Sequence, residues 1–496
     1  MLNLLKNFFQ TKYEFFVIPV LLLLGTNFSH NLLGKESLRL DESQSIWQVS
    51  RSLNEVFRII ASDVHLPLYG IILYFWRTIV GSEIFDNRQI SLIFFLLGII
   101  AIYNLAKLIS NNKNIALFVS LIFTVSPYMN WYANELRMYS LLVLLATLSH
   151  LFYLRIFFES KFKKLNWILY FVISLLGIYT HYFYFIILLT QVIFYFLFRY
   201  NFPKNSFRNF TIIFSCLILS FTPWIYLVFS LGNAKNQTPL LTKPSTVDFF
   251  NIYSQQIFGF QVDSVNSLIL SFWPILGLLS LLLLKKNNIL KPKFVYLGFA
   301  TFIPIILSFI VSYSVKPIFL SRYLSICVPS MFIIIACVIF SYGKNLSRIL
   351  RILIVGLMLT SLFSQVASAQ TPVKENYREA ITYIISSSKK QDIVAISAPF
   401  TIFTFDYYYN GINPLVTIPN WDRRTTIPVF NSQSMVNQVN SYVPIHDKIY
   451  LLLSYDQGYE KQIKQYFDDN FLKIEAITFS PKLNLYVYDL KNRPSN

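Results

Sequence analysis

Charged residues are scarce in this sequence: they make up 13% of its 496 residues, whereas soluble domains carry about 25%. Hydrophobic residues make up 55% and aromatic residues 18%, and the mean hydropathy is +0.51. A soluble core of this length could not bury so much apolar surface, but a lipid bilayer can cover it. The composition therefore predicts an integral membrane protein.

Cysteine is also rare, which excludes a disulfide scaffold. The chain has three cysteines, each inside an apolar run and without paired or metal-ligand spacing: Cys216, Cys327 and Cys337. Internal repeats and low-complexity tracts are absent as well. The cysteines are interpreted as small core residues.

The net charge of +18 raises the alternative of a nucleic-acid-binding protein. The basic residues, however, form short clusters between apolar runs rather than one basic face or tail. This placement argues against nucleic acid as a partner. It is typical of the loops of a membrane protein.

The apolar runs predict about eleven membrane helices, since a span needs roughly 20 mostly apolar residues. The first run follows Lys6 and Lys12 and is expected to be an uncleaved first helix. The predicted spans cover residues 15–33, 89–108, 114–130, 138–158, 165–181, 184–200, 210–231, 264–284, 294–312, 322–342 and 349–367.

The basic clusters predict the orientation, because cytoplasmic loops are enriched in Lys and Arg. The run 66–82 is short and contains Arg77. If it does not span, the basic clusters all fall on the side of the basic N-terminus. Residues 34–88 then form a long external loop in which 66–82 is an interfacial helix. The clusters are Lys107/Lys113, Arg155/Lys161/Lys163/Lys164, Arg199/Lys204/Arg208, Lys285/Lys286/Lys291/Lys293 and Lys344/Arg348/Arg351.

The composition changes after the last span, which predicts two domains: a membrane domain over 1–370 and a small extracytoplasmic α/β domain over 371–496. Apolar runs become short and acids and bases nearly balance. The spacing of apolar residues predicts strands at 391–397, 447–453 and 483–489 and helices at 376–388 and 458–470. The fold class is thus a mainly α, polytopic bundle with a C-terminal α/β domain.

Ionisable residues gather in the predicted external segments, close to the membrane, where such residues tend to mark function. They are Asp41, Glu42, Asp63, His65, Arg88, Glu135, Arg137, His181 and Arg322, with Tyr323 beside the last.

Seven of these residues also have a structural interpretation. Asp41 and Glu42 would be a solvated loop pair, and His181 an interfacial histidine bonded to a carbonyl. Arg137 and Arg322 would be snorkelling anchors. Asp63 and His65 would share a hydrogen bond or hold a metal ion.

Together the residues suit transfer from a lipid-phosphate donor. A carboxylate can take a proton from an acceptor, and arginines can hold a phosphate leaving group. A transporter or flippase of lipid-linked intermediates would instead place charges near mid-membrane, where the predicted spans have almost none. A non-catalytic membrane scaffold is the other alternative.

The order of several motifs resembles family-39 glycosyltransferases. These are GT-C enzymes related to protein O-mannosyltransferases and to lipid A aminoarabinose transferases. The resemblance covers roughly residues 10–345. The motifs are Asp41-Glu42, D-x-H-x-P-L-Y from residue 63, Arg88, W-Y-x-x-E-x-R-M-Y-S-L from 131, Y-T-H-Y from 179 and R-Y-L from 322.

The resemblance implies a hexosyl- or pentosyltransferase that uses a polyprenyl-phosphate sugar and inverts the anomeric centre. It implies that Asp41 is the catalytic base and that Glu42 positions the acceptor or the loop. Arg88, Arg137, Arg322 and Tyr323 would bind the donor phosphate. Asp63, His65, Glu135 and His181 would line the substrate site or a metal site; His65-Leu66-Pro67 departs from the family's usual His-Pro-Pro.

The resemblance also implies the partners and the location. The partners are a polyprenyl-phosphate-linked sugar, the lipid bilayer, and a lipid, glycan or protein acceptor. The residues identify no cofactor with certainty, and a divalent metal is possible because some relatives bind one and others do not. The expected location is the plasma (inner) membrane, with a cytoplasmic N-terminus.

Overall fold

The computed structural model describes residues 13–30, 36–63, 65–158, 163–231, 242–262, 264–271, 292–368, 374–423 and 425–493. The chain forms two compact units. The helical unit comprises Met1–Leu33, Ser52–Ala234 and Thr238–Ala367. The sheet unit comprises the described residues of 34–51 and 368–496. The predicted external loop 34–88 is therefore shared between the two units rather than belonging to the membrane domain alone.

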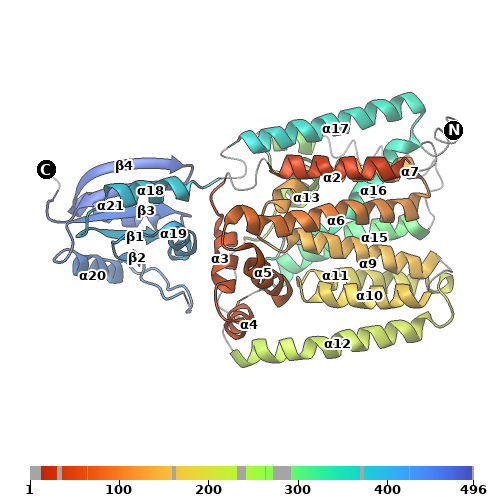
Figure 1. Ribbon diagram of the computed structural model, residues 1–496, viewed down its shortest axis with the longest axis horizontal. Coiled ribbons are helices and arrows are strands. Elements are labelled where there is room, and N and C mark those ends of the chain that lie inside the picture. The colour runs from red at the N-terminus through yellow and green to blue at the C-terminus, as the bar shows by residue number, and fades with distance from the viewer. Residues whose placement is uncertain are drawn as a thin grey trace. The chain divides into compact units, whose positions relative to one another are not determined.

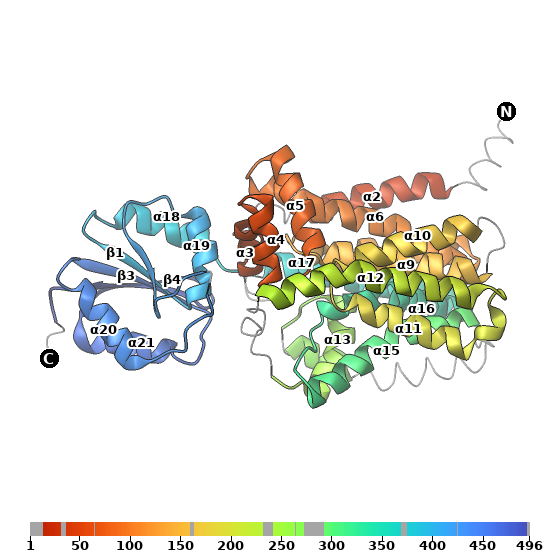
Figure 2. The same cartoon turned by 90° about the horizontal axis from the view of Figure 1, so that it is seen from below.

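Long apolar helices build the helical unit and run side by side in both views (Figures 1 and 2). A helix satisfies every backbone polar group within its own segment, as a hydrocarbon environment requires. The helices are α2 (Glu14–His30), α4 (Leu53–Ala61), α5 (Pro67–Val80), α6 (Ile84–Ser110), α7 (Lys113–Thr124), α8 (Pro127–Ala133), α9 (Tyr139–Phe158), α10 (Lys163–Ile178), α11 (Tyr184–Leu197), η1 (Arg199–Asn201), α12 (Ser206–Leu231), α13 (Thr246–Phe258), α15 (Pro292–Ser314), η3 (Tyr323–Cys327), α16 (Val328–Ser341) and α17 (Lys344–Ala367).

Within the described residues, six helices are long and apolar enough to cross a membrane. A seventh span results if α7 and α8, which are bent by 60° relative to each other, count as one. Four further apolar helices, α2, α5, α10 and α11, are shorter. The polytopic helical class is thus confirmed, but the predicted count of eleven is not. Of the predicted run 264–284, only 264–271 lies within the described residues.

Helix α5 occupies the segment that was expected to lie in the membrane interface. Its 14 residues extend about 21 Å, less than the hydrocarbon thickness of about 30 Å. In both views α4 and α5 lie across one end of the long helices (Figures 1 and 2). The loops that join α6 to α7, α11 to α12 and α16 to α17 lie at the other end (Figure 1). Residues of the predicted basic clusters lie in these loops or in the helix ends next to them.

The sheet unit is a three-layer α/β structure. Its five strands follow the order β2-β1-β3-β5-β4; β1 pairs in parallel with β2 and β3, whereas β5 is antiparallel to β3 and β4. Helices α18 and α19 cover one face and α20 and α21 the other (Figure 2). The elements are α18 (Tyr377–Ser387), β1 (Ile393–Ser397), η4 (Pro399–Thr401), α19 (Ile402–Tyr408), β2 (Leu415–Thr417), α20 (Ser432–Tyr442), β3 (Lys448–Ser454), α21 (Glu460–Asn470), β4 (Leu472–Ser480) and β5 (Leu483–Asp489).

Helix α3 (Leu40–Val49) belongs to this sheet unit and lies beside α19 in both views (Figures 1 and 2). The Ser43 and Thr404 hydroxyl oxygens are 2.8 Å apart, and the rings of Trp47 and Phe403 are 4.9 Å apart. These contacts are buried or aromatic, so they join α3 firmly to the C-terminal part of the chain.

Candidate functional site

An irregular backbone segment between α8 and α9 positions Glu135 and Arg137. Buried side chains satisfy the backbone groups that regular structure leaves without partners here. The amide of Asn134 donates to the Asn130 carbonyl at 2.7 Å, and the Ser140 hydroxyl donates to the Tyr132 carbonyl at 2.9 Å. The segment is therefore held in one conformation, and both charged side chains are buried.

Arg88 lies on α6, close to the same segment. It is only 1% exposed and stands three residues before Ser91, on the same helix face. The Ser91 hydroxyl donates to the Glu135 carbonyl at 2.7 Å, and Tyr69 of α5 is 3.0 Å from that hydroxyl. Helices α5 and α6 are thus fastened to the 134–138 segment beside Arg88.

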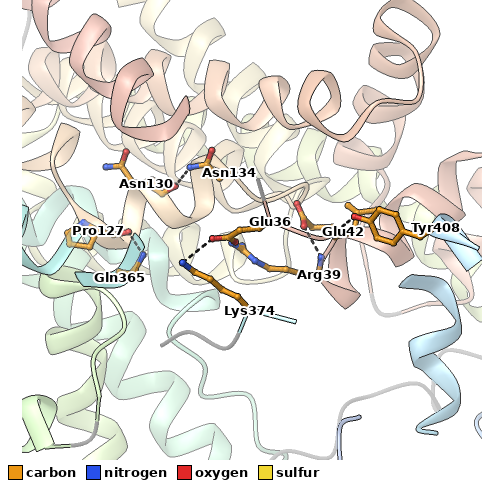
Figure 3. Close-up of polar contacts among 10 residues, drawn as sticks. Glu36, Arg39, Glu42, Pro127, Asn130, Asn134, Gln365, Lys374 and Tyr408 are labelled. Carbon is orange, nitrogen blue, oxygen red and sulfur yellow. Dashed lines mark hydrogen bonds and ion pairs between the residues drawn. The ribbon is translucent and has the colours of Figure 1, made fainter. Parts of the chain in front are cut away.

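Helix α8 is fixed from its other side by Gln365 of α17. The Gln365 amide donates to the Pro127 carbonyl at 3.1 Å (Figure 3), and its oxygen accepts from the Phe260 N–H at 3.0 Å. Gly259 has φ +69°, and a Cβ there would lie 2.4 Å from the Gln365 oxygen and 2.6 Å from Pro127. Only glycine fits this close approach.

Asp63, His65 and Arg137 form a hydrogen-bonded chain. Nδ1 of His65 is 2.8 Å from a carboxylate oxygen of Asp63, and Nη2 of Arg137 is hydrogen-bonded to Nε2 of His65. A guanidinium can only donate, so Nε2 must accept and Nδ1 must carry the proton that is donated to Asp63. The chain therefore orients Arg137, which is 4% exposed and does not reach into water as a snorkelling anchor would.

His181 lies in the turn between α10 and α11, next to this chain. The Leu68 N–H donates to the Tyr179 carbonyl at 3.0 Å, which ties the start of α5 to the turn. Burial, together with the neighbouring positive charges of Arg137 and Arg322, lowers the pKa of His181 to about 3. His181 is therefore neutral at physiological pH.

Arg322 and Tyr323 reach the same place from the loop before α16. The Ser321 carbonyl accepts from the Tyr128 hydroxyl at 2.6 Å, which fixes the loop against α8. The ring of Tyr323 lies 5.0 Å from that of His181, and the Arg322 guanidinium lies 5.5 Å from the Tyr323 ring. We call Asp63, His65, Arg137, His181, Arg322 and Tyr323 the charged cluster.

The charged cluster has a surplus of positive charge. Arg137 and Arg322 are always protonated, and Asp63 is the carboxylate within the cluster. Glu135, two residues from Arg137, adds a second carboxylate at its edge. A site with rigid arginines beside neutral histidines suits a phosphate group.

The same residues fit a metal ion poorly. His65 uses both ring nitrogens in hydrogen bonds, and Nδ1 of His181 accepts from the Phe183 N–H at 3.1 Å, which leaves the proton on Nε2. A metal-binding imidazole needs a free lone pair. In the part of the chain that the structure describes, no three His, Cys, Asp or Glu side chains gather as a ligand set. Asp63, His65, Glu135 and His181 are therefore interpreted as substrate-site residues.

Asp41 and Glu42 lie in the first turn of α3, within the sheet unit. Glu42 is fully buried, and its carboxylate accepts from the Arg39 N–H at 3.0 Å (Figure 3). This contact caps α3, so Glu42 orders the loop. Asp41 is only partly buried, and its carboxylate is favourably placed at the N-terminus of the helix dipole.

The start of α3 is surrounded by charged residues that the sequence pattern did not indicate as part of a site. Glu36 accepts from Arg39 at 3.0 Å and pairs with Lys374 at 3.2 Å (Figure 3). Burial raises the pKa of Glu375 to about 7, and the nearby charge of Asp41 also raises it, whereas a hydrogen bond with Tyr455 lowers it. These partners come from segments more than 300 residues apart, so no local pattern could have revealed them.

The sequence matches no family model, and no curated protein matches it either. Solved structures do match. Apo ArnT from Cupriavidus metallidurans superposes with a TM-score of 0.64 at 11% identity, over 96% of this chain and 98% of that one. The same protein bound to undecaprenyl phosphate gives a TM-score of 0.63 at 12% identity, over the same shares of the two chains. The chain has the GT-C glycosyltransferase fold.

Two more distant GT-C structures agree with this assignment. The Archaeoglobus fulgidus oligosaccharyltransferase, solved with Zn and sulfate, has a TM-score of 0.52 at 10% identity, over 92% of this chain and 71% of that one. The mycobacterial arabinofuranosyltransferase AftD has a TM-score of 0.52 at 11% identity, over 97% of this chain and 40% of that one. The fold expected from the motif resemblance is therefore confirmed.

Proposed function

We propose that this GT-C protein is a membrane glycosyltransferase that moves a hexose or pentose from a polyprenyl-phosphate donor to an acceptor. The observation that carries the proposal is the charged cluster, in which the Asp63–His65–Arg137 chain lies beside His181 and Arg322. The structural likeness to ArnT, which was solved with undecaprenyl phosphate, supports a donor of this class.

In this proposal Arg137 and Arg322 bind the donor phosphate. Two fixed guanidinium groups stabilise the negative charge that develops as polyprenyl phosphate leaves. Neutral His181 offers its Nε2–H as a further donor. Arg88 and Tyr323 complete the phosphate environment, and Glu135 contributes to the sugar side of the site.

Asp41 is the proposed base, an assignment that rests on the motif resemblance. Its carboxylate takes the proton from the acceptor hydroxyl or amine as the acceptor atom bonds to the anomeric carbon. The bond from that carbon to the phosphate oxygen breaks, and its electron pair leaves with polyprenyl phosphate. Attack from the face opposite the leaving group inverts the anomeric centre.

The reaction face follows from the basic clusters. Lys107 and Lys113 flank the loop that joins α6 to α7, and Arg199 and Lys204 lie between α11 and α12. Both connections lie at the end of the helical unit away from α4 and α5 (Figure 1). Cytoplasmic loops are enriched in such residues, so we assign that end to the cytoplasm and the charged cluster to the extracytoplasmic side of the plasma membrane.

Incubation of the purified protein with a panel of polyprenyl-phosphate sugars tests the proposal. With the matching donor and a membrane-glycan acceptor fraction, we expect polyprenyl phosphate to appear at the rate of sugar transfer. The matched control is the Asp41→Asn variant, which keeps the shape of the side chain. If wild type and variant release the same amount with every donor, the proposed function is wrong.

A further inference from the structure

A pocket of about 370 Å³ opens on the sheet unit, between α3, α19 and the segment that follows β2. Its volume lies within the range of ligand pockets, about 300–1,000 Å³. All lining residues belong to the sheet unit, so the pocket does not depend on the helical unit. It is lined by Trp47, Arg51, Ile402, Trp421, Asp422 and Arg423.

The aromatic part of the lining is rigid. The Trp47 ring packs on Phe403 at 4.9 Å, and Phe403 packs edge-on against Trp421 at 5.7 Å. The Trp421 indole N–H donates to the Thr425 carbonyl at 3.0 Å, and its backbone N–H donates to the Thr417 hydroxyl at 2.9 Å. Aromatic rings held in this way offer a flat surface on which a ring can lie with little loss of entropy.

Arg51 gives the pocket its charge. Its guanidinium lies 4.7 Å from the Trp47 ring, and its buried Nε has no hydrogen-bond partner among the residues that the structure describes. By contrast, Arg423 is 2.7 Å from a carboxylate oxygen of Asp406. A guanidinium that is stacked on a ring and has an Nε without an acceptor is suited to an anionic group of a ligand.

Asp422 adds the opposite polarity, because its carboxylate accepts hydrogen bonds and so suits hydroxyl groups. The pocket thus combines a flat apolar surface, a carboxylate that can accept hydrogen bonds and a cation that fits an anion. A sugar ring that bears a carboxylate or phosphate carries all three complementary features in one small molecule.

We infer that this pocket binds an acidic saccharide, with the sugar ring against Trp47 and Trp421 and the anionic group on Arg51. Trp47 follows Asp41 by six residues on α3, about 9 Å along the helix axis. A saccharide in the pocket would therefore be bound by the helix that carries the proposed base. Its assignment as the acceptor rests on the proposed function, whereas its binding does not.

Calorimetric titration of the full-length protein in detergent tests the inference. The probes are trigalacturonate, glucose 6-phosphate, neutral maltotriose and inorganic phosphate. We expect trigalacturonate or glucose 6-phosphate to bind at least ten times more tightly than the other two probes, and the better of the pair identifies the anionic group. The Arg51→Gln variant should lose at least tenfold in affinity for it, and Arg51→Lys should lose less.

Arg378→Gln is the matched control, because the exposed Arg378 also stacks on a ring, that of Tyr408, but does not line the pocket. It should bind as wild type does. Equal binding of maltotriose and trigalacturonate, or equal binding by Arg51→Gln and wild type, would overturn the inference. So would inorganic phosphate that binds as tightly as the saccharides, or the absence of binding to any probe.

The two proposals can fail separately. Saccharide binding without release of polyprenyl phosphate from any donor would leave the pocket in place and contradict the transferase. Sugar transfer without binding of either acidic saccharide would support the transferase and overturn the acidic-saccharide site.

Discussion

Replacement of His65 tests whether the Asp63–His65–Arg137 chain positions the donor phosphate. His65 donates from Nδ1 to Asp63 at 2.8 Å and accepts at Nε2 from Arg137. In His65→Leu both charged groups, which are 5% and 4% exposed, lose that partner. In His65→Gln the amide oxygen can accept from Arg137 and the amide N–H can donate to Asp63.

The expected effect follows from the hydrogen bonds lost. A hydrogen bond to a charged group contributes about 1.5–3 kcal/mol, and each 1.4 kcal/mol corresponds to a factor of about ten in rate. If the free energy that orients Arg137 acts on the phosphate, kcat/KM for the donor should fall about 10- to 100-fold in His65→Leu. In His65→Gln it should fall less than about fivefold, since both hydrogen bonds can be replaced.

The assay is the initial rate of polyprenyl phosphate release over a range of donor concentrations, at equal amounts of monodisperse protein. The matched control is His446→Leu. His446 also uses Nδ1 in a hydrogen bond, to the Gln391 carbonyl at 3.1 Å, but it belongs to the sheet unit and is not part of the charged cluster. A His65→Leu enzyme within twofold of wild type would refute the reasoning, as would a His65→Gln enzyme as impaired as His65→Leu.

Three further predictions address other parts of the site. Arg322→Lys keeps the charge but loses bidentate geometry, so donor affinity measured by equilibrium binding should fall. Arg322→Ala should weaken donor affinity more. Full donor affinity in the Lys variant would instead make Arg322 a snorkelling anchor. Asp41→Asn should reduce the rate of sugar transfer about 10²–10⁴-fold with donor binding retained. Glu42→Gln should mainly lower the free energy of unfolding, by about 1 kcal/mol, through the loss of helix capping. If Glu42→Gln slowed transfer more than Asp41→Asn did, the two roles would be reversed. Burial lowers the pKa of His181 to about 3 in the folded protein, whereas the unfolded chain has the ordinary value of about 6.5. Between these two values the unfolded state binds more protons than the folded state. The free energy of unfolding should therefore fall as the pH drops below about 6.5, by at most about 1.4 kcal/mol per pH unit. Denaturant unfolding at pH 7 and pH 5 should show this loss in wild type and less of it in His181→Asn; an equal loss in both would contradict it.

Much of the fold was predictable because its signal is local. Long apolar runs predicted the helices, and short apolar runs predicted β1, β3 and β5, which are buried in the sheet. Strand β4 was missed because it is a largely exposed edge strand, where Lys473 and Glu475 interrupt the apolar pattern. An edge strand needs only one hydrogen-bonded neighbour, and its composition is correspondingly mixed.

The grouping of α3 with the sheet unit was not predictable, because it depends on contacts across the chain. Ser43 meets Thr404, 361 residues later, and nothing near Ser43 in the sequence indicates that partner. The assignment of 34–51 to the membrane domain followed from the basic clusters, which placed these residues in an external loop between two predicted spans.

Some contacts of the candidate site were likewise predictable from the sequence, and others were not. The two-residue spacing of Asp63 and His65 predicted that they point the same way and could share a hydrogen bond, and the structure has that bond. The partner Arg137 lies 72 residues beyond His65, and only tertiary folding brings the two together. Glu375 was missed because a single acidic residue in a polar segment carries no signal until its burial is known.

The most direct test of the central claim is a sided transfer assay in sealed membrane vesicles. A radiolabelled polyprenyl-phosphate sugar that the purified protein accepts is added to right-side-out and to inside-out vesicles with equal amounts of the protein. We predict labelled glycan and free polyprenyl phosphate with right-side-out vesicles, and neither with intact inside-out vesicles until detergent opens them. Release confined to intact inside-out vesicles, or absent from both preparations, would contradict an extracytoplasmic glycosyltransferase.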